Sequence, residues 1–252
     1  MASSSDEEVQ DPQSVTDIYY VDDTENNVDD LESDADPICA ICDDGGRIVR
    51  CEGRCRRSFH ATIVDGIETG CNSLGLSEAQ IQAIDTFLCK NCEYNQHQCF
   101  VCGSLGSSDM LAGAQVFPCV DATCGHFYHP KCVADLLFPE NEMEATECEL
   151  MIADGESFTC PAHKCHVCNQ EENKEVPELQ FAVCRRCPMS YHRQCLPGEI
   201  VLDGAQEGVI QRAWESLIPE RILIYCLRHE IDANLGTPRR NHIIFPEIPE
   251  GN

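Results

Sequence analysis

Cysteine and histidine side chains occur in this sequence as short pairs, most of them separated by two to four residues. This spacing suits metal coordination, because two side chains on one tight turn can reach the same Zn²⁺ ion. The 252 residues include 20 Cys and 9 His, so these ligands form a framework. Disulfides fit less well, since no apolar signal peptide follows Met1 and the thiols alternate with histidines. The pattern therefore predicts zinc in a reducing compartment.

The ligands group into three sets of eight, and a histidine is the fifth member of every set. Zinc prefers four nitrogen or sulfur ligands, so the sets predict two ions each and six ions in all. We expect a cross-braced arrangement, in which the first and third pairs hold one ion and the second and fourth pairs hold the other. None of the quartets leaves a position for water, which is typical of structural rather than catalytic zinc. The predicted quartets are Cys39, Cys42, His60 and Cys71; Cys51, Cys55, Cys89 and Cys92; Cys99, Cys102, His129 and Cys132; Cys119, Cys124, Cys160 and His163; Cys165, Cys168, His192 and Cys195; and Cys184, Cys187, Cys226 and His229.

One cysteine and four histidines remain outside this scheme. His126 could replace His129 as a ligand, but the spacing of His129 to the next cysteine recurs in the third set and favours it. Cys148 is expected to be a buried small apolar residue on a helix rather than a reactive thiol, because no base stands near it in the sequence. The other histidines outside the scheme are His97, His166 and His242.

The chain as a whole is acidic, with 44 Asp and Glu against 17 Lys and Arg. This balance disfavours direct nucleic-acid binding, which needs a surplus of cations, and no apolar stretch is long enough to cross a membrane. Only Lys164 separates the last two fingers, so we expect the three fingers to pack as one rigid rod. The predicted segments are an acidic disordered tail, 1–36; three fingers, 37–95, 96–163 and 164–232, the last two fused; and a C-terminal extension, 233–252.

Short strands and helices must position the ligands. Strands are predicted at 47–50, 116–118 and 179–183, each just before the third ligand of its finger, where a two-stranded ribbon is expected. Helices are predicted from a capping box at Ser77 to about Phe87, at 141–153 and at about 205–218. Phe87, Phe158, Trp214 and Ile224 are expected to be packing residues. The fold class is thus a small zinc-stabilised α+β fold, with a ribbon and a helix in each finger.

The ligand order, the aromatic residue before the fifth ligand and an aromatic residue near the last pair resemble the plant homeodomain (PHD) finger. RING fingers place histidine fourth, so a RING-like ubiquitin ligase is disfavoured. The phrases ICAICDDGGRIVRCEGRCRRSFHATIVDG, CFVCGSLGSSD, ATCGHFYHPKCV and LQFAVCRRCPMSYHRQCLP resemble the plant Enhanced Downy Mildew 2 family over residues 37–246. This resemblance implies a nuclear role in silent chromatin, in transcript processing and in immune-gene expression. It carries over no enzymatic activity, because the methyltransferase-like region of full-length relatives is absent from these residues.

The first finger also resembles PHD fingers that read histone H3 tails. An extended peptide could add a strand to its ribbon, with the acidic groups of Asp44 and Glu52 holding a basic side chain. Arg47 stands where related readers often have an acid, and the finger has no Trp to form a methyl-lysine cage, so trimethyl-lysine binding is not expected. The predicted peptide-binding residues are Asp43, Asp44, Gly46, Arg47, Ile48, Val49, Arg50 and Glu52.

An interaction platform is the alternative function. The fused second and third fingers resemble the terminal PHD pair of histone-methyltransferase proteins, and their joint surface could bind a chromatin-associated protein without reading histone marks. Arg185, Arg186 and Arg193 could form a basic patch on that surface. A zinc hydrolase is disfavoured because every predicted metal site is closed.

Overall fold

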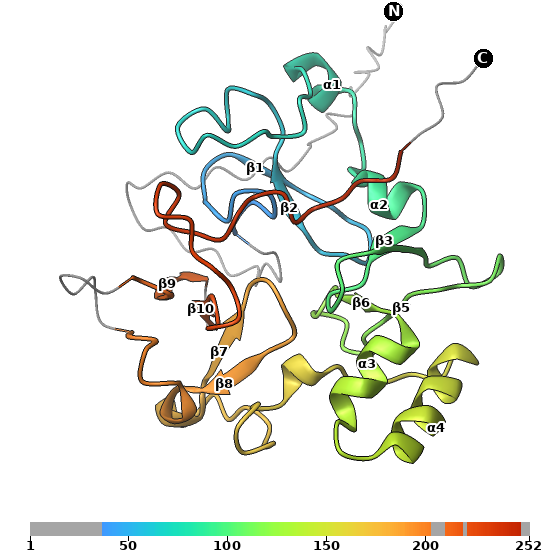
Figure 1. The fold of residues 1–252 in the computed structure, drawn as a ribbon. Coiled ribbons are helices and arrows are strands. Elements are labelled where there is room, and N and C mark those ends of the chain that lie inside the picture. The colour runs from blue at the N-terminus through green and yellow to red at the C-terminus, as the bar shows by residue number, and fades with distance from the viewer. Residues whose placement is uncertain (1–36, 203–209, 219–220, 248–252) are drawn as a thin grey trace, which may run out of the picture.

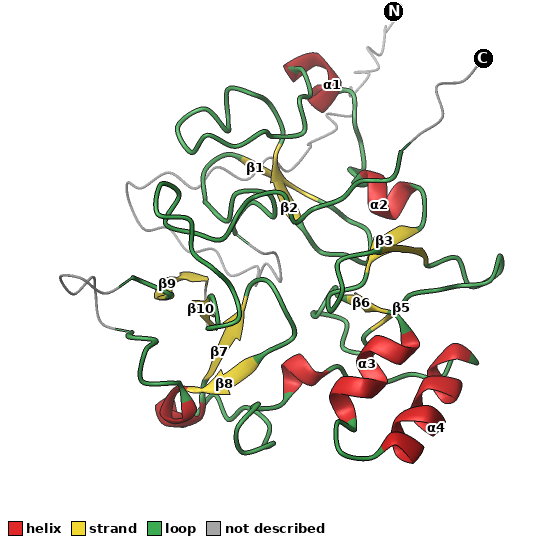
Figure 2. Ribbon diagram, in the orientation of Figure 1, coloured by secondary structure: helices red, strands yellow, loops and turns green. Residues whose placement is uncertain are grey.

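The structure is a computed structural model that describes residues 37–202, 210–218 and 221–247, and the predicted acidic tail, 1–36, lies outside these ranges. Short helices and strands are joined by long loops (Figure 2), which confirms the predicted small α+β fold with short antiparallel ribbons. Several small cores rich in cysteine take the place of one large apolar interior, and the predicted packing residues Phe87, Phe158 and Ile224 lie in them. No helix in the described part is long and apolar enough to traverse a bilayer.

The first finger holds the predicted ribbon at the top of Figure 1. Its elements are β1 (Ile48–Arg50), β2 (Ser58–His60), α1 (Glu78–Gln82) and α2 (Lys90–Glu93). Ser77 and Gln80 form the predicted capping box that opens α1. The helix ends at Gln82, before the predicted end near Phe87. The backbone N–H of Glu52 donates to Phe87 O (2.9 Å), which holds the following segment beside the third ligand.

The second finger is the most helical part of the described residues. Its elements are β3 (Gln96–Gln98), β4 (Leu105–Ser107), β5 (Phe117–Pro118), β6 (Phe127–Tyr128), α3 (Pro130–Leu137), α4 (Glu142–Ala153) and the short 3-10 helix η1 (Pro161–His163). The predicted strand at 116–118 and the predicted helix at 141–153 are confirmed, and Asn141 caps α4 by accepting from Glu144 N. Helix α3 was not predicted, although Pro130 stands at its start, where proline is favoured. The two helices pack through the buried side chains of Val133 and Ile152.

The third finger contains a larger sheet than the predicted two-stranded ribbon. Its elements are the 3-10 helices η2 (Pro177–Leu179) and η3 (Arg193–Cys195) and the strands β7 (Phe181–Cys184), β8 (Ser190–His192), β9 (Ala213–Ile218) and β10 (Arg221–Ile224), and the strand order is β8-β7-β10-β9. The helix predicted at 205–218 is wrong for 210–218, while 203–209 lie outside the described residues. Residue Trp214 pairs with Leu223 across β9 and β10, and its ring packs edge-on against Tyr225 (5.5 Å between centroids), which confirms its packing role.

The fingers form a triangle, so the predicted rod is wrong. A buried contact joins the first finger to the third: Asp43 accepts hydrogen bonds from Arg185 Nε (3.1 Å) and Tyr225 Oη (2.7 Å), and it pairs with Arg186. The first and second fingers also approach closely, since a Cβ at Gly125 would lie 2.5 Å from Cys55 O. With the one-residue link at Lys164 between the second and third fingers, each finger touches both others.

Residues 239–245 form a C-terminal strap that returns across the first two fingers, shown in red in Figure 1. The side chain of Gln98 donates to His242 O (2.9 Å) and accepts from Ile244 N (2.8 Å). Burial lowers the pKa of His242 to about 3, so its imidazole is neutral, and Nε2 donates to Ala40 O (2.9 Å). The ring of Phe245 packs against Phe59 of β2. The strap therefore closes the triangle on one side.

Candidate metal centres and peptide-binding edge

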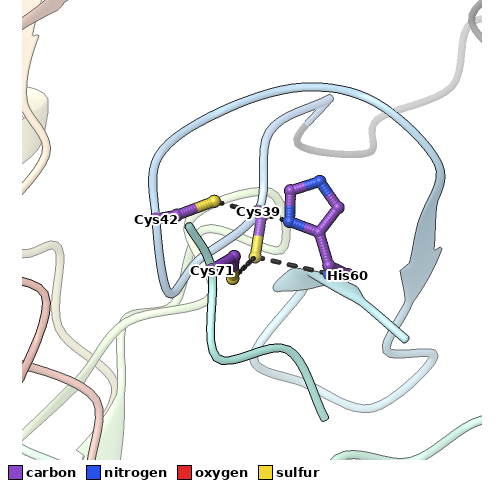
Figure 3. Close-up of side chains that lie close together, drawn as sticks. All are labelled: Cys39, Cys42, His60 and Cys71. Carbon is purple, nitrogen blue, oxygen red and sulfur yellow. Dashed lines mark hydrogen bonds between the residues drawn. The ribbon is translucent and has the colours of Figure 1, made fainter. Parts of the chain in front are cut away.

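The first quartet of each finger gathers three cysteines and one histidine. In the first finger the ligand atoms of Cys39, Cys42, His60 and Cys71 all lie within 4.8 Å of one another (Figure 3). The β1–β2 ribbon and the two loops beside it bring these residues together from distant positions in the sequence. The corresponding quartets beginning at Cys99 and Cys165 are equally compact.

The imidazole of the first quartet is oriented by a second hydrogen bond. His60 directs Nδ1 toward Cys42 Sγ (3.4 Å), while its Nε2 donates to Gly45 O (2.8 Å). His192 repeats this arrangement in the third finger, with Nδ1 toward Cys168 Sγ (3.2 Å) and Nε2 donating to Glu171 O (2.9 Å). Such outer hydrogen bonds fix the tautomer of a metal-bound histidine.

The second quartets interleave with the first and thereby cross-brace each finger. The sets Cys51, Cys55, Cys89, Cys92 and Cys119, Cys124, Cys160, His163 meet the same 4.8 Å limit. In the third finger Cys187 and Cys226 place their sulfurs 3.6 Å apart, and the thiols of Cys184 and Cys226 beside His229 raise the pKa of its imidazole to about 9. The ring nitrogens Nε2 of His163 and His229 are buried without a hydrogen-bond partner among the described residues. A metal ion in each of these two quartets would supply the missing partner of its histidine nitrogen.

These clusters fit tetrahedral zinc in their distances and their charge. Zinc–sulfur bonds of about 2.3 Å require sulfur atoms about 3.8 Å apart in a tetrahedron. The sulfur pairs of Cys39 with Cys71 and of Cys124 with Cys160 lie 3.8 and 3.7 Å apart, and all 20 cysteines are free of disulfides. Metal binding deprotonates the thiols of Cys39, Cys42 and Cys71, and a Zn²⁺ ion would balance the charge of these thiolates. The donor set and geometry therefore support zinc binding.

The residues left outside the scheme have structural roles in this fold. The structure gathers His129, and not His126, with the third quartet. His126 stacks on Phe100 (3.7 Å between centroids), and burial lowers its pKa to about 3. His97 stacks in the same way on Phe127. Cys148 lies on α4 and packs against the core of the second finger, as predicted, but it is only partly buried.

Strand β1 offers an open edge in the first finger. Within the described residues it pairs only with β2, in the register Ile48 with His60, Val49 with Phe59 and Arg50 with Ser58. The next pair is hydrogen-bonded, because Cys51 N donates to Arg57 O (2.8 Å). Bonded pairs alternate in antiparallel ribbons, so Val49 directs its backbone groups to β2, while Ile48 and Arg50 direct theirs to the open edge. An extended peptide could use these groups.

Asp43 does not belong to this edge, which corrects its predicted peptide-binding role. Its side chain is 0% exposed and is held by Arg185, Arg186 and Tyr225 of the third finger. Burial lowers the pKa of Arg186, and the Asp43 carboxylate opposes that shift. Sequence reasoning missed Tyr225 as a partner because it lies far from Asp43 along the chain.

The other predicted residues surround β1, and several have a defined structural partner. Asp44 is exposed. Gly46 has φ +109°, and a Cβ there would lie 3.3 Å from His60 Nε2, so glycine makes room for the metal-binding imidazole. Arg47 pairs with Glu78, and Glu52 is exposed and accepts from Phe87 N (3.2 Å). The open edge is therefore flanked by carboxylates and by one paired arginine.

The basic patch predicted on the third finger is wrong, because its arginines are engaged within the chain. Arg185 and Arg186 hold Asp43, and the Arg186 side chain is only 5% exposed. Arg193 pairs with Glu215 at 2.6 Å. Arg185 and Arg186 therefore join the third finger to the first, and Arg193 joins η3 to β9, instead of binding a partner protein.

Cross-braced Cys/His quartets suited to zinc, carried on short antiparallel ribbons, are the arrangement found in PHD-type zinc fingers. The family described as histone-lysine N-methyltransferase NSD-like, PHD zinc finger, matches residues 95–163. Protein ENHANCED DOWNY MILDEW 2 of Arabidopsis thaliana is 52% identical over 234 residues, which cover 92% of this chain and 18% of that protein. The predicted resemblance to the Enhanced Downy Mildew 2 family is therefore confirmed over this region.

Two methyltransferases share a shorter region with this chain. Histone-lysine N-methyltransferase NSD3 of Mus musculus is 32% identical over 162 residues, covering 64% of this chain and 9% of that enzyme. Histone-lysine N-methyltransferase, H3 lysine-36 specific, of Homo sapiens is 28% identical over 157 residues, covering 62% of this chain and 5% of that enzyme. The chain thus spans less than a fifth of the length of each relative, and the likeness to the enzymes includes their PHD region.

Proposed function

We propose that the chain is a non-enzymatic chromatin reader whose first finger binds a histone H3 tail along the open edge of β1. The observation that carries this proposal is the edge itself, where Ile48 and Arg50 direct their backbone groups away from β2. Strand addition supplies affinity through backbone hydrogen bonds and selectivity through alternate side chains. The open edge is the feature of the first finger that the third finger lacks.

Charge favours a basic tail as the ligand of this edge. Asp44 and Glu52 are exposed beside β1 and could hold a Lys or Arg side chain, while the chain as a whole carries a formal charge of −27. The only Trp of the chain is Trp214 in the third finger. The first finger therefore lacks the Trp wall that favours trimethyl-lysine, and we expect it to prefer a lysine with few or no methyl groups.

The metal content and organisation follow from the same proposal. We infer six zinc ions, two in each of three fingers at 37–95, 96–163 and 164–232, with 233–252 as an extension. The family match at 95–163 supports the boundaries of the second finger. The likeness to Protein ENHANCED DOWNY MILDEW 2 supports a nuclear regulator of silent chromatin and of plant defence. Structural zinc without an open ligand position supports a role without catalysis.

The test is a titration of the zinc-loaded chain with H3 tail peptides, unmodified or methylated at different lysines. Matched variants locate the site: Arg50→Pro removes the N–H at the open edge, and Arg50→Ala keeps it while removing the same charge. We expect Arg50→Pro to lose binding and Arg50→Ala to retain most of it. Equal binding by both variants, with unchanged zinc content, would place the peptide elsewhere.

An interaction platform is the second candidate function. It is favoured by the triangle of fingers, which presents one rigid surface rather than three independent modules, and by the third finger, whose own strand fills the edge used for peptides. The same titration separates the two candidates. Failure of every H3 peptide to bind would favour the platform.

A further inference from the structure

Helix α4 of the second finger exposes a group of large apolar side chains that no part of the described chain covers. Met143, Leu150 and Met151 are 77%, 63% and 44% exposed, whereas Ala145 and Ile152 on the opposite side are buried. Residues at these spacings share one helix face. Thr146 and Glu147 lie between Met143 and Leu150 on this exposed side, so it carries both apolar and polar side chains, while the opposite side packs against α3 and the finger core.

A neighbouring loop extends this exposed face. The methyl group of Met110 lies 3.3 Å from the position that a Cβ would take at Gly155, just beyond the end of α4. Met110 is 56% exposed and Leu111 is 99% exposed, and the Asp109 side chain fixes their turn by accepting from Leu111 N (2.9 Å). We call this surface the methionine face. Its members are Met110, Leu111, Met143, Leu150 and Met151.

The composition of the methionine face is characteristic of a binding surface. It holds three of the five methionines of the chain, and flexible methionine side chains adapt to partner surfaces. A group of exposed apolar side chains on one surface marks an interaction site more often than single exposed residues do. These side chains span about 12 Å along α4 from Met143 to Met151, which is about two helical turns.

Carboxylates surround this face and determine the charge of its partner. The segment from 140 to 156 contains seven Asp and Glu residues and no Lys or Arg. The nearby Lys131 is paired with Asp135 (3.3 Å) on α3. A phosphate-bearing surface would be repelled, whereas a cationic segment would gain both apolar burial and electrostatic attraction. The partner must therefore combine apolar and basic side chains.

The geometry also selects the partner's conformation. A helix has no open backbone edge, so α4 can be bound only through side chains, unlike β1. The exposed apolar side chains of α4, two turns apart, can pack against the apolar stripe of another helix, and Glu147 between them can pair with a cationic side chain of that helix. We propose that the methionine face docks a basic amphipathic helix of a partner protein. This docking is independent of histone reading at the first finger.

The test uses the zinc-loaded full chain carrying ¹³C-methyl-labelled methionine. The probe is a helical peptide of about 14 residues, roughly 21 Å long, built only from Leu on one face and Lys on the other. We expect the methyl resonances of Met110, Met143 and Met151 to shift, while that of Met189, which is 5% exposed in the third finger, stays in place. Unshifted resonances at all three exposed methionines would overturn the proposal, as would an equal response to a peptide of Leu and Glu.

Two double variants separate this site from attraction to the acidic chain as a whole. Leu150→Lys with Met151→Lys adds two charges on the methionine face, and Ile63→Lys with Val64→Lys adds the same charges at exposed apolar residues of the first finger. We expect the first pair to raise Kd at least about tenfold, a loss of about 1.4 kcal/mol, and the second to leave it nearly unchanged. Equal weakening by both would show nonspecific attraction. Self-association of the chain that only the first pair abolishes would identify a second copy as the occupant and overturn the proposal.

Discussion

The first and third fingers use the same ligand framework but treat the edge of their central strand differently. In the first finger β1 pairs only with β2 among the described residues. In the third finger the equivalent strand, β7, pairs with β8 on one side and lies parallel to β10 on the other, where Arg185 N donates to Ile224 O (2.9 Å). The third finger thus occupies, with its own chain, the edge that the first finger leaves open.

This difference shows that the zinc ligands specify the fold of a finger but not whether its central strand can bind a peptide. The residues between the third and fourth ligand pairs decide whether the edge is filled. In the first finger they form the short helix α1, which adds no strand to β1, and in the third they form β9 and β10. A count of fingers therefore overstates the number of sites available to an extended peptide.

Removal of zinc should have the largest effect and should erase the difference between the fingers. Structural zinc contributes about 10–16 kcal/mol per site, which exceeds a net stability of about 5–15 kcal/mol. We expect a strong chelator to abolish amide protection in the four-stranded sheet of the third finger as completely as in the first. Hydrogen exchange measured by NMR checks this. Protected amides that survive in β7 and β10 would show that the sheet is stable without metal.

The Asp43→Ala variant should have the next largest effect, because it separates the first finger from the third. It leaves the Arg186 guanidinium, 5% exposed, without its carboxylate, and such a loss costs about 3–5 kcal/mol. Thermal unfolding of the zinc-loaded chain measures the loss. The exposed Asp44→Ala variant is the control and should unfold like the parent. Similar unfolding of both variants would mean that the two fingers are not coupled through Asp43.

Proline substitution one residue before the third ligand tests the two edges directly. Val183 of β7 directs its N–H toward β10, as Arg185 does two residues later, whereas Arg50 of β1 directs its N–H to the open edge. Val183→Pro should therefore destabilise the chain by about 2–3 kcal/mol, and Arg50→Pro by much less. Thermal unfolding with zinc analysis distinguishes them. Equal losses would show that the edge of β1 is bonded to part of the chain.

The Tyr225→Phe variant should have the smallest effect. It removes only the hydrogen bond from Tyr225 Oη to Asp43 (2.7 Å) and keeps the ring that packs on Trp214. A hydrogen bond to a charged group contributes about 1.5 kcal/mol or somewhat more. We expect a small decrease in unfolding temperature and unchanged H3 peptide binding. Loss of peptide binding in this variant would show that the third finger shapes the edge of the first.

The local features of this fold could be predicted from the sequence. Ligand spacing acts within tight turns, so it indicated the quartets that the structure gathers and favoured His129 over His126. The capping box at Ser77 and the helix around 141–153 depend on neighbouring residues in the same way. The predicted helix at 205–218 failed because the apolar residues there serve a strand whose partner, β10, completes the sheet of the third finger.

The contacts between fingers could not be predicted, because nothing local distinguishes the residues that make them. Asp43 lies in an Asp-Asp-Gly-Gly segment that is typical of an exposed turn, yet its carboxylate is buried against Arg186, 143 residues further along the chain. Gln98 binds the strap through its side-chain amide, and polar residues of this kind are usually solvated. The predicted rod was wrong for this reason.

The distance along the chain between Asp43 and Arg186 also sets a delay during synthesis. At about 5–20 residues per second, ribosomes would make the arginine roughly 7 to 29 s after the aspartate. The first finger can collect its own metal ligands in that interval, but its buried carboxylate must stay hydrated until the third finger emerges. Docking of the first finger against the third is therefore a late step in folding, although the residues of the first finger leave the ribosome first.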